Sequence, residues 1–135
     1  LCVLDGEVVP FGLDDLPGLV RGNETEGHRI MSSGAFAVRS FAEYEAGLRE
    51  RRVILDAAER MRVIEEGLAA LAAEKGLHVV PDRGLLEEVA GLVEWPVPTL
   101  GRIDDAFMDL PPEVMRTTMR VNQRYFALSH EDGSA

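Results

Sequence analysis

One amphipathic pattern in the middle of the chain limits most strongly what it can fold into. Over residues 57–71, apolar side chains recur at steps of three and four, which places them on one face of a helix. The positions are Ala57, Met61, Ile64, Leu68 and Leu71. Asp56 and Glu59 form a capping pair at the start, and Gly76 is a residue type that ends helices. The pattern predicts a helix ending near Gly76, with Leu68 and Leu71 on its buried stripe.

Further helices are predicted from their start signals, which place a capping side chain or a Pro at the first turn. The signals predict a helix over 41–51 after Ser40, one from Asp82 to Trp95-Pro96, a short turn over 104–110, and one from Pro111 to about residue 122. The second of these ends at Trp95 because a residue before Pro is pushed out of the helical region.

Short strands are predicted on both sides of these helices. They cover two halves of 1–13 around the hairpin signal Asp5-Gly6, then 25–31, 35–39, 97–103 and 123–129. The turn signal at 131–133 predicts that a returning strand follows beyond the chain. Strands flank a helical middle instead of alternating with helices, which indicates an α+β fold. We expect a mostly antiparallel sheet with a central run of about three helices, and a single domain over 1–135.

Composition and motifs exclude several function classes. The chain has 24 acidic and 14 basic residues and a net charge of -10, so an RNA could be contacted only through a local basic patch. One cysteine and three scattered histidines predict neither an internal disulfide nor a metal site. No phosphate-binding glycine loop and no nucleophile elbow occur, and no apolar run approaches the roughly 20 residues that span a membrane. We therefore predict no catalytic, cofactor-binding or metal-binding residue.

Two groups of basic side chains are candidate contacts with RNA or another ligand. His28 and Arg29 could form a polar anchor, or belong to a strand in which Arg29 pairs with an acid and His28 bonds to backbone. Arg116, Arg120 and Arg124 step by four, so at least the first two share a helix face. They could track phosphates, or form a solvated face that the abundant acids neutralise. We favour the structural interpretation in both cases.

Several stretches resemble the β subunits of bacterial glycyl-tRNA synthetases. They read LLEEVAGLVEWPV at 85–97, FMDLPPEV at 107–114, TTM at 117–119 and QRYF at 123–126. Upstream, LDGEVVP at 4–10 and TEGHRIM at 25–31 fit the same family. Glu26 stands where that family has an arginine, and Ala127 where it commonly has a proline. The resemblance spans nearly the whole chain in the expected order.

The resemblance implies a fragment from the N-terminal third of such a subunit, similar in fold to the B3/B4 module of phenylalanyl-tRNA synthetase β chains. The absence of an initiator Met before Leu1 agrees with a fragment. In this family the α subunit activates glycine, so ATP and Mg are expected there and no cofactor is expected in this fragment. The implied partners are the α subunit, in a cytoplasmic α2β2 assembly, and glycine tRNA through the full-length β subunit. No contact with a membrane is expected.

The role of the fragment leaves alternatives open. The related phenylalanyl module edits mischarged tRNA, but glycine is the smallest amino acid, so a tight activation pocket can exclude its competitors. We therefore expect a structural or docking module without its own catalytic centre. The alternatives are a tRNA-contacting module, or an editing-like hydrolytic or ligand-binding domain that uses His28, Arg29, Thr117 or Thr118. A cavity of at least ~300 Å³ with convergent polar groups would favour the editing-like domain.

Overall fold

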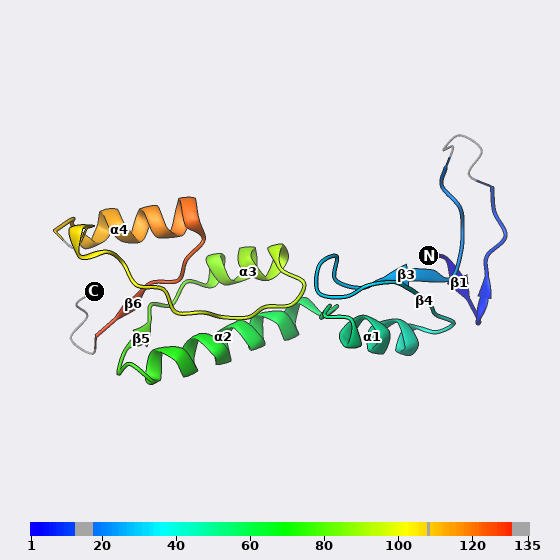
Figure 1. Cartoon of the computed structure of the whole chain (residues 1–135), viewed down its shortest axis with the longest axis horizontal. Helices are drawn as coiled ribbons and strands as arrows, with labels where there is room; N and C mark the ends of the chain where they lie inside the picture. The colour runs from blue at the N-terminus through cyan, green and yellow to red at the C-terminus, as the bar shows by residue number, and fades with distance from the viewer. Residues whose placement is uncertain (13–17, 108, 131–135) are drawn as a thin grey trace. The chain divides into compact units, whose positions relative to one another are not determined.

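The computed structural model describes residues 1–12, 18–107 and 109–130 (Figure 1). Contacts divide the chain into two compact units, Leu1–Leu55 and Asp56–Ala135, and each is described by itself. One domain over 1–135 therefore stays a prediction. Among the described helices, none is both long and apolar enough to cross a membrane.

Two antiparallel strand pairs open the first unit. β1 (Val3–Leu4) pairs with β2 (Glu7–Val8), and β3 (Glu24–Glu26) pairs with β4 (Ala35–Ala37). Asp5 and Gly6 both have positive φ, 50° and 84°, as a two-residue hairpin turn requires. The predicted hairpin is confirmed. The strand predicted over 25–31 was too long, because the chain turns from residue 28 onward.

Helix α1 (Phe41–Glu50) begins at the predicted cap. The Ser40 hydroxyl accepts a hydrogen bond from the Glu43 amide at 3.2 Å, and the Glu43 carboxylate accepts one from the Arg39 amide at 2.8 Å. The buried apolar side chains of this unit come from the segments on both sides of the helix and from the helix itself; they are Val38, Leu48 and Ile54.

The second unit is built on α2 (Ala57–Ala73) and α3 (Arg83–Leu92), which lie side by side (Figure 1). The Asp56 carboxylate caps α2 by accepting from the Glu59 amide at 2.8 Å, and the positive φ of Gly76, 65°, follows its last turn. The core forms where Ile64 of α2 meets two buried side chains of α3, Leu86 and Ala90; around it pack Met61, Leu68, Val89, Val93 and Phe126. The predicted helix is confirmed.

The burial predicted for Leu68 and Leu71 needs correction. Both side chains are only partly buried, whereas Ile64 and Ala72 are the fully buried residues of α2. Leu68 and Leu71 lie on the expected face, but that face borders a cavity toward the end of the helix. Periodicity identified the face of the helix and could not identify how deeply each position is covered.

The segment 97–103 is extended but pairs with no strand, contrary to prediction. It crosses α2 at Gly67, where an added Cβ would lie 2.7 Å from Pro98 Cγ. Pro96 and Pro98 lack the amide hydrogen that a strand ladder uses. This segment therefore covers part of α2 and adds no strand to a sheet.

The last elements are η1 (Asp105–Phe107), α4 (Pro112–Thr118), the π-helical turn η2 (Met119–Gln123) and β6 (Leu128–Ser129). The predicted final helix is present, but its last turn is widened and ends at Arg124, whose φ of 58° is left-handed. β6 pairs with β5 (His78–Val79), a strand that was not predicted. The turn signal at 131–133 lies outside the described residues.

The fold class is α+β, with short antiparallel sheets and four α-helices in the described part of the chain. The prediction of one mostly antiparallel sheet was wrong in detail. The strands form separate pairs, β1-β2, β3-β4 and β5-β6. Each of these strands is two or three residues long, at or below the short end of the usual range.

Candidate functional site

His28 closes a turn with its imidazole. Its Nδ1 accepts hydrogen bonds from the amides of Ile30 and Met31, both at 3.1 Å. Its own amide donates to the Arg51 carbonyl at 2.8 Å, and its carbonyl accepts from the Ser32 hydroxyl at 3.2 Å. The ring therefore organises the backbone of this turn in the way an Asn side chain does in an Asx turn.

Gly27 explains how this turn comes so close to the end of α1. A Cβ at Gly27 would lie 2.2 Å from Arg51 Cβ and 2.7 Å from the Arg51 carbonyl oxygen. Arg51 in turn stacks on the Phe36 ring, with its guanidinium carbon 4.1 Å from the ring centroid. Arg29 is exposed, and no ion pair of Arg29 occurs among the described residues. The geometry of His28 thus matches the structural interpretation, whereas the described part of the chain holds no acid that pairs with Arg29 as expected.

We predict opposite outcomes for two substitutions of His28. His28→Ala removes the acceptor of two amides and should lower the free energy of unfolding of the first unit by about 0.5–2 kcal/mol, the range of lost caps. His28→Asn keeps an acceptor at the δ position and should lose less than half as much. Amide hydrogen exchange at residues 28–32 measures both. Equal losses in the two variants would contradict the capping role.

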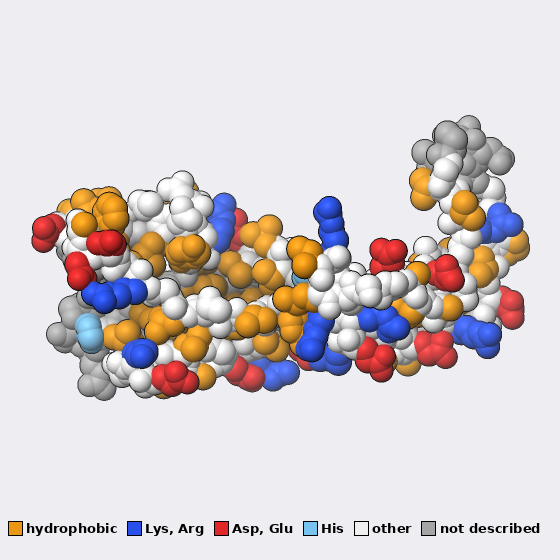
Figure 2. All heavy atoms as spheres, in the orientation of Figure 1, with side chains coloured by type: hydrophobic (Ala, Val, Ile, Leu, Met, Phe, Trp, Pro, Cys, Tyr) orange, Lys and Arg blue, Asp and Glu red, His pale blue; other side chains and the backbone are white. Residues whose placement is uncertain are grey.

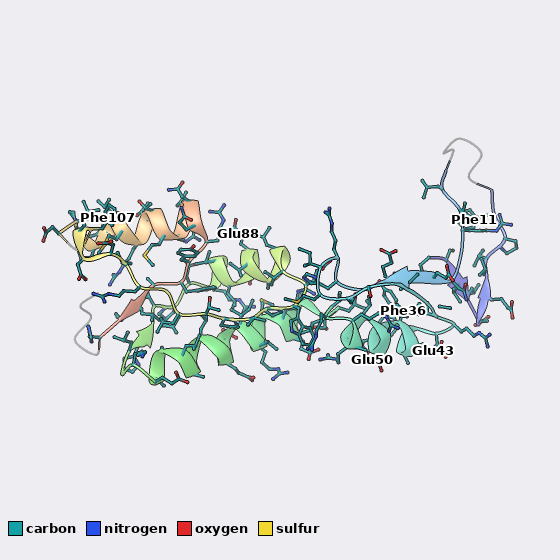
Figure 3. The ribbon with its side chains drawn as sticks, viewed as in Figure 1. Phe11, Phe36, Glu43, Glu50, Glu88 and Phe107 are labelled. Atoms are coloured by element: carbon teal, nitrogen blue, oxygen red, sulfur yellow. The ribbon has the colours of Figure 1, made fainter. Side chains whose placement is uncertain are left out.

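Arg120 and Arg124 form ion pairs with two acidic residues at α3. Arg120 Nε lies 2.5 Å from Asp82 Oδ2, and Arg124 Nε lies 2.6 Å from Glu88 Oε1 (Figure 3 labels Glu88). Asp82 also caps α3 through the Leu85 amide at 2.9 Å. These two ion pairs join the turn after α4 to α3.

The hydrogen bond from Arg120, together with that from the Leu85 amide, lowers the pKa of Asp82 below its ordinary value of 3.8. A lowered carboxyl pKa contributes stability above the ordinary value, and that contribution is lost as the pH falls through the lowered one. The stability that the Asp82–Arg120 ion pair contributes is therefore fully present at neutral pH.

Arg116 differs from the other two arginines. Its side chain is half-buried, and its Nε is shielded from solvent with no hydrogen-bond partner among the described residues. Arg116 and Arg124 line the same cavity, and Arg120 does not. Equal spacing in the sequence suggested that the three arginines would act together. In the structure their surroundings differ, so they do not form one group.

The cavity itself is open, has a volume of about 1040 Å³ and is lined mainly by apolar side chains. In Figure 2 these appear as orange side chains in the hollow between α4 and α2. The lining comes mainly from α2, the segment 96–103, α4 and residues 124–130, with single side chains from α3, η1 and η2. Met115 and Met119, which lie four positions apart, border this hollow. Apolar periodicity was the available signal, but it cannot distinguish a core from an open groove.

The cavity exceeds the volume that would favour an editing-like domain, but it lacks the residues that were predicted for one. His28, Arg29, Thr117 and Thr118 do not line it. The carboxylate in its lining is that of Asp105, and it forms an ion pair with Arg102. Arg102 Nη2 lies 2.8 Å from Asp105 Oδ1. No cluster of three or more metal-binding side chains occurs in the described ranges. The arrangement is suited to burying apolar surface.

Comparison with known proteins gives a consistent family. A sequence model described as the glycyl-tRNA synthetase beta subunit matches residues 1–135. The glycine–tRNA ligase beta subunit of Phenylobacterium zucineum (strain HLK1) is 57% identical over 134 residues, covering 98% of this chain and 20% of that protein. That of Paracoccus denitrificans (strain Pd 1222) is 49% identical over 131 residues, covering 94% and 19%. The chain spans about a fifth of the length of these relatives.

Proposed function

Because this chain belongs to the glycyl-tRNA synthetase beta subunit family, we propose that it works as part of a glycine–tRNA ligase and supports the attachment of glycine to its tRNA. The match over all 135 residues carries this proposal. The ATP-dependent ligase activity, the α2β2 assembly with an α subunit, the contact with tRNA and the cytoplasmic location belong to the proposal. ATP and Mg would be bound by the α subunit.

Within that enzyme, this region acts as a structural or docking module without its own catalytic centre. His28, a candidate contact residue, instead accepts hydrogen bonds from two backbone amides and so organises a turn. Arg120 and Arg124 are neutralised by acids of this chain. The large cavity offers apolar surface and no free carboxylate among its described lining. These observations support a role in packing, and the likeness to the B3/B4 module of phenylalanyl-tRNA synthetase β chains is part of the same proposal.

A tRNA-contacting module is the second candidate. The observations that favour it are the unpaired state of Arg116 and the exposure of Arg29, neither of which has an ion-pair partner among the described residues. The net charge of -10 opposes it, because the average field of the chain repels phosphates.

The test uses a full-length β subunit that contains this region, assembled with its α subunit. The assembly should charge tRNA with glycine, and neither subunit alone should do so. The variant with Arg116, Arg120 and Arg124 all changed to Gln should keep the same dependence of tRNA affinity on salt. Each lost phosphate contact would lower that slope by about one.

The matched control changes Asp82→Asn and Glu88→Gln, which breaks the same two ion pairs without removing a cation. A slope lower by two or three in the arginine variant alone would contradict the docking role and favour the tRNA-contacting module. Absence of glycine charging by the wild-type assembly would contradict the proposed function itself.

A further inference from the structure

We propose that the cavity of the second unit is a docking groove for another segment of the same β-subunit polypeptide, from outside residues 1–135. That segment presents an apolar face and places a carboxylate against Arg116. The inference rests on the proposed function and names the docking surface and its occupant.

The apolar lining is the first observation. α2 contributes Leu68 and Leu71, α4 contributes Met115, and η2 contributes Met119. The extended segment contributes Leu100, which is 42% exposed. These side chains face one hollow (Figure 2). Concave surfaces lined mainly by apolar side chains are common sites of contact with protein or ligand.

The charges around the groove are the second observation. Arg102 and Arg124 have acidic partners, Asp105 and Glu88. Arg116 Nε has none among the described residues, although it is shielded from solvent. A shielded donor without an acceptor is unfavourable, and more so on a charged group. A carboxylate delivered by the occupant would supply that acceptor, and Lys75 at the same lining adds positive charge that attracts it.

The length of the relatives decides between possible occupants. This region covers 20% of the Phenylobacterium protein, so about four fifths of such a polypeptide lies outside it. A covalently linked segment that can reach the groove binds it intramolecularly, at an effective concentration that can be millimolar, and needs no second molecule. Mostly apolar contact surfaces are typical of permanent contacts, not of nucleic-acid contacts, which depend on phosphate neutralisation.

The experiment places a photo-crosslinking amino acid at Leu71 in the full-length β subunit, without α subunit or tRNA. The matched control is the same group at Ala70, which is exposed, adjacent on α2 and not part of the lining. Irradiation at position 71 should join the groove to a β-subunit peptide outside residues 1–135. The yield at position 70 should be at least about tenfold lower, since the two positions lie on different helix faces.

Arg116→Gln should reduce the cross-link at position 71 about tenfold or more, because it removes one partner of a shielded charge pair. Arg62→Gln, which breaks an exposed pair with Glu66, should leave it unchanged. Three results would overturn the inference: a product that requires the α subunit or tRNA, a product confined to residues 1–135, or no excess over position 70. Glycine charging by the assembled enzyme, measured on the same subunit, separates the two proposals. Charging without the cross-link contradicts only the docking groove, and the cross-link without charging contradicts only the proposed function.

Discussion

Leu86→Ala should lower the free energy of unfolding of the second unit by about 2–5 kcal/mol. The Leu86 side chain is 4% exposed and forms the core with Ile64 and Ala90. Truncation removes buried methyl groups and leaves a void between α2 and α3. The two helices are held together there by the Arg60 guanidinium, which donates to the Ala90 carbonyl at 2.8 Å, so they cannot readily close the void.

The chain offers a probe and a control for this measurement. Trp95 is its single tryptophan and belongs to the second unit, so its fluorescence in a urea titration reports unfolding of that unit. Leu92→Ala removes the same atoms from the same helix at a side chain that is 68% exposed. It should change stability by less than about 0.5 kcal/mol. Similar losses from both variants would show that the core does not lie between α2 and α3.

Gly47→Ala should lower the free energy of unfolding of the first unit by roughly 1–3 kcal/mol. An added Cβ would lie 2.2 Å from Cε2 of Phe36, whose ring faces α1 (Figure 3). That ring has little freedom to move, because Arg51 stacks on it and β4 holds its backbone opposite Thr25. The gain of about 1 kcal/mol from replacing a helical glycine offsets only part of this cost.

The same substitution at Gly91 of α3 is the matched control. Nothing lies within 4 Å of a Cβ there, and the position is exposed. Gly91→Ala should therefore raise stability, by up to about 1 kcal/mol. Amide hydrogen exchange follows each unit separately. Phe36→Leu introduced with Gly47→Ala should recover part of the loss, and stabilisation by Gly47→Ala alone would mean that Phe36 does not pack on α1.

Family membership and the local elements could be predicted from sequence. The predicted caps Ser40, Asp56 and Asp82 each accept a hydrogen bond from the expected amide three residues later. The predicted Asp5-Gly6 turn joins β1 to β2. These features depend on hydrogen bonds that span a few residues, so the local sequence contains all the groups that form them.

The candidate sites depended on residues far apart in sequence. Whether an arginine of the 116–124 series is neutralised depends on Asp82, which lies 38 positions from Arg120. His28 acts through its neighbours' amides, but its place in the unit comes from the Arg51 carbonyl. Equal spacing along a helix could not distinguish the paired Arg120 from the unpaired Arg116, because the partners belong to another helix.

The sequence alone determined which segments are helical, where they begin, and which face of each is apolar, because propensity, capping and periodicity act within one element. Only the tertiary structure decided how those faces are covered. It paired β5 with β6, laid the proline-rich segment 96–98 over Gly67, and left Leu68 and Leu71 beside an open hollow. Burial depends on what packs across from a residue, and that partner comes from a different part of the chain.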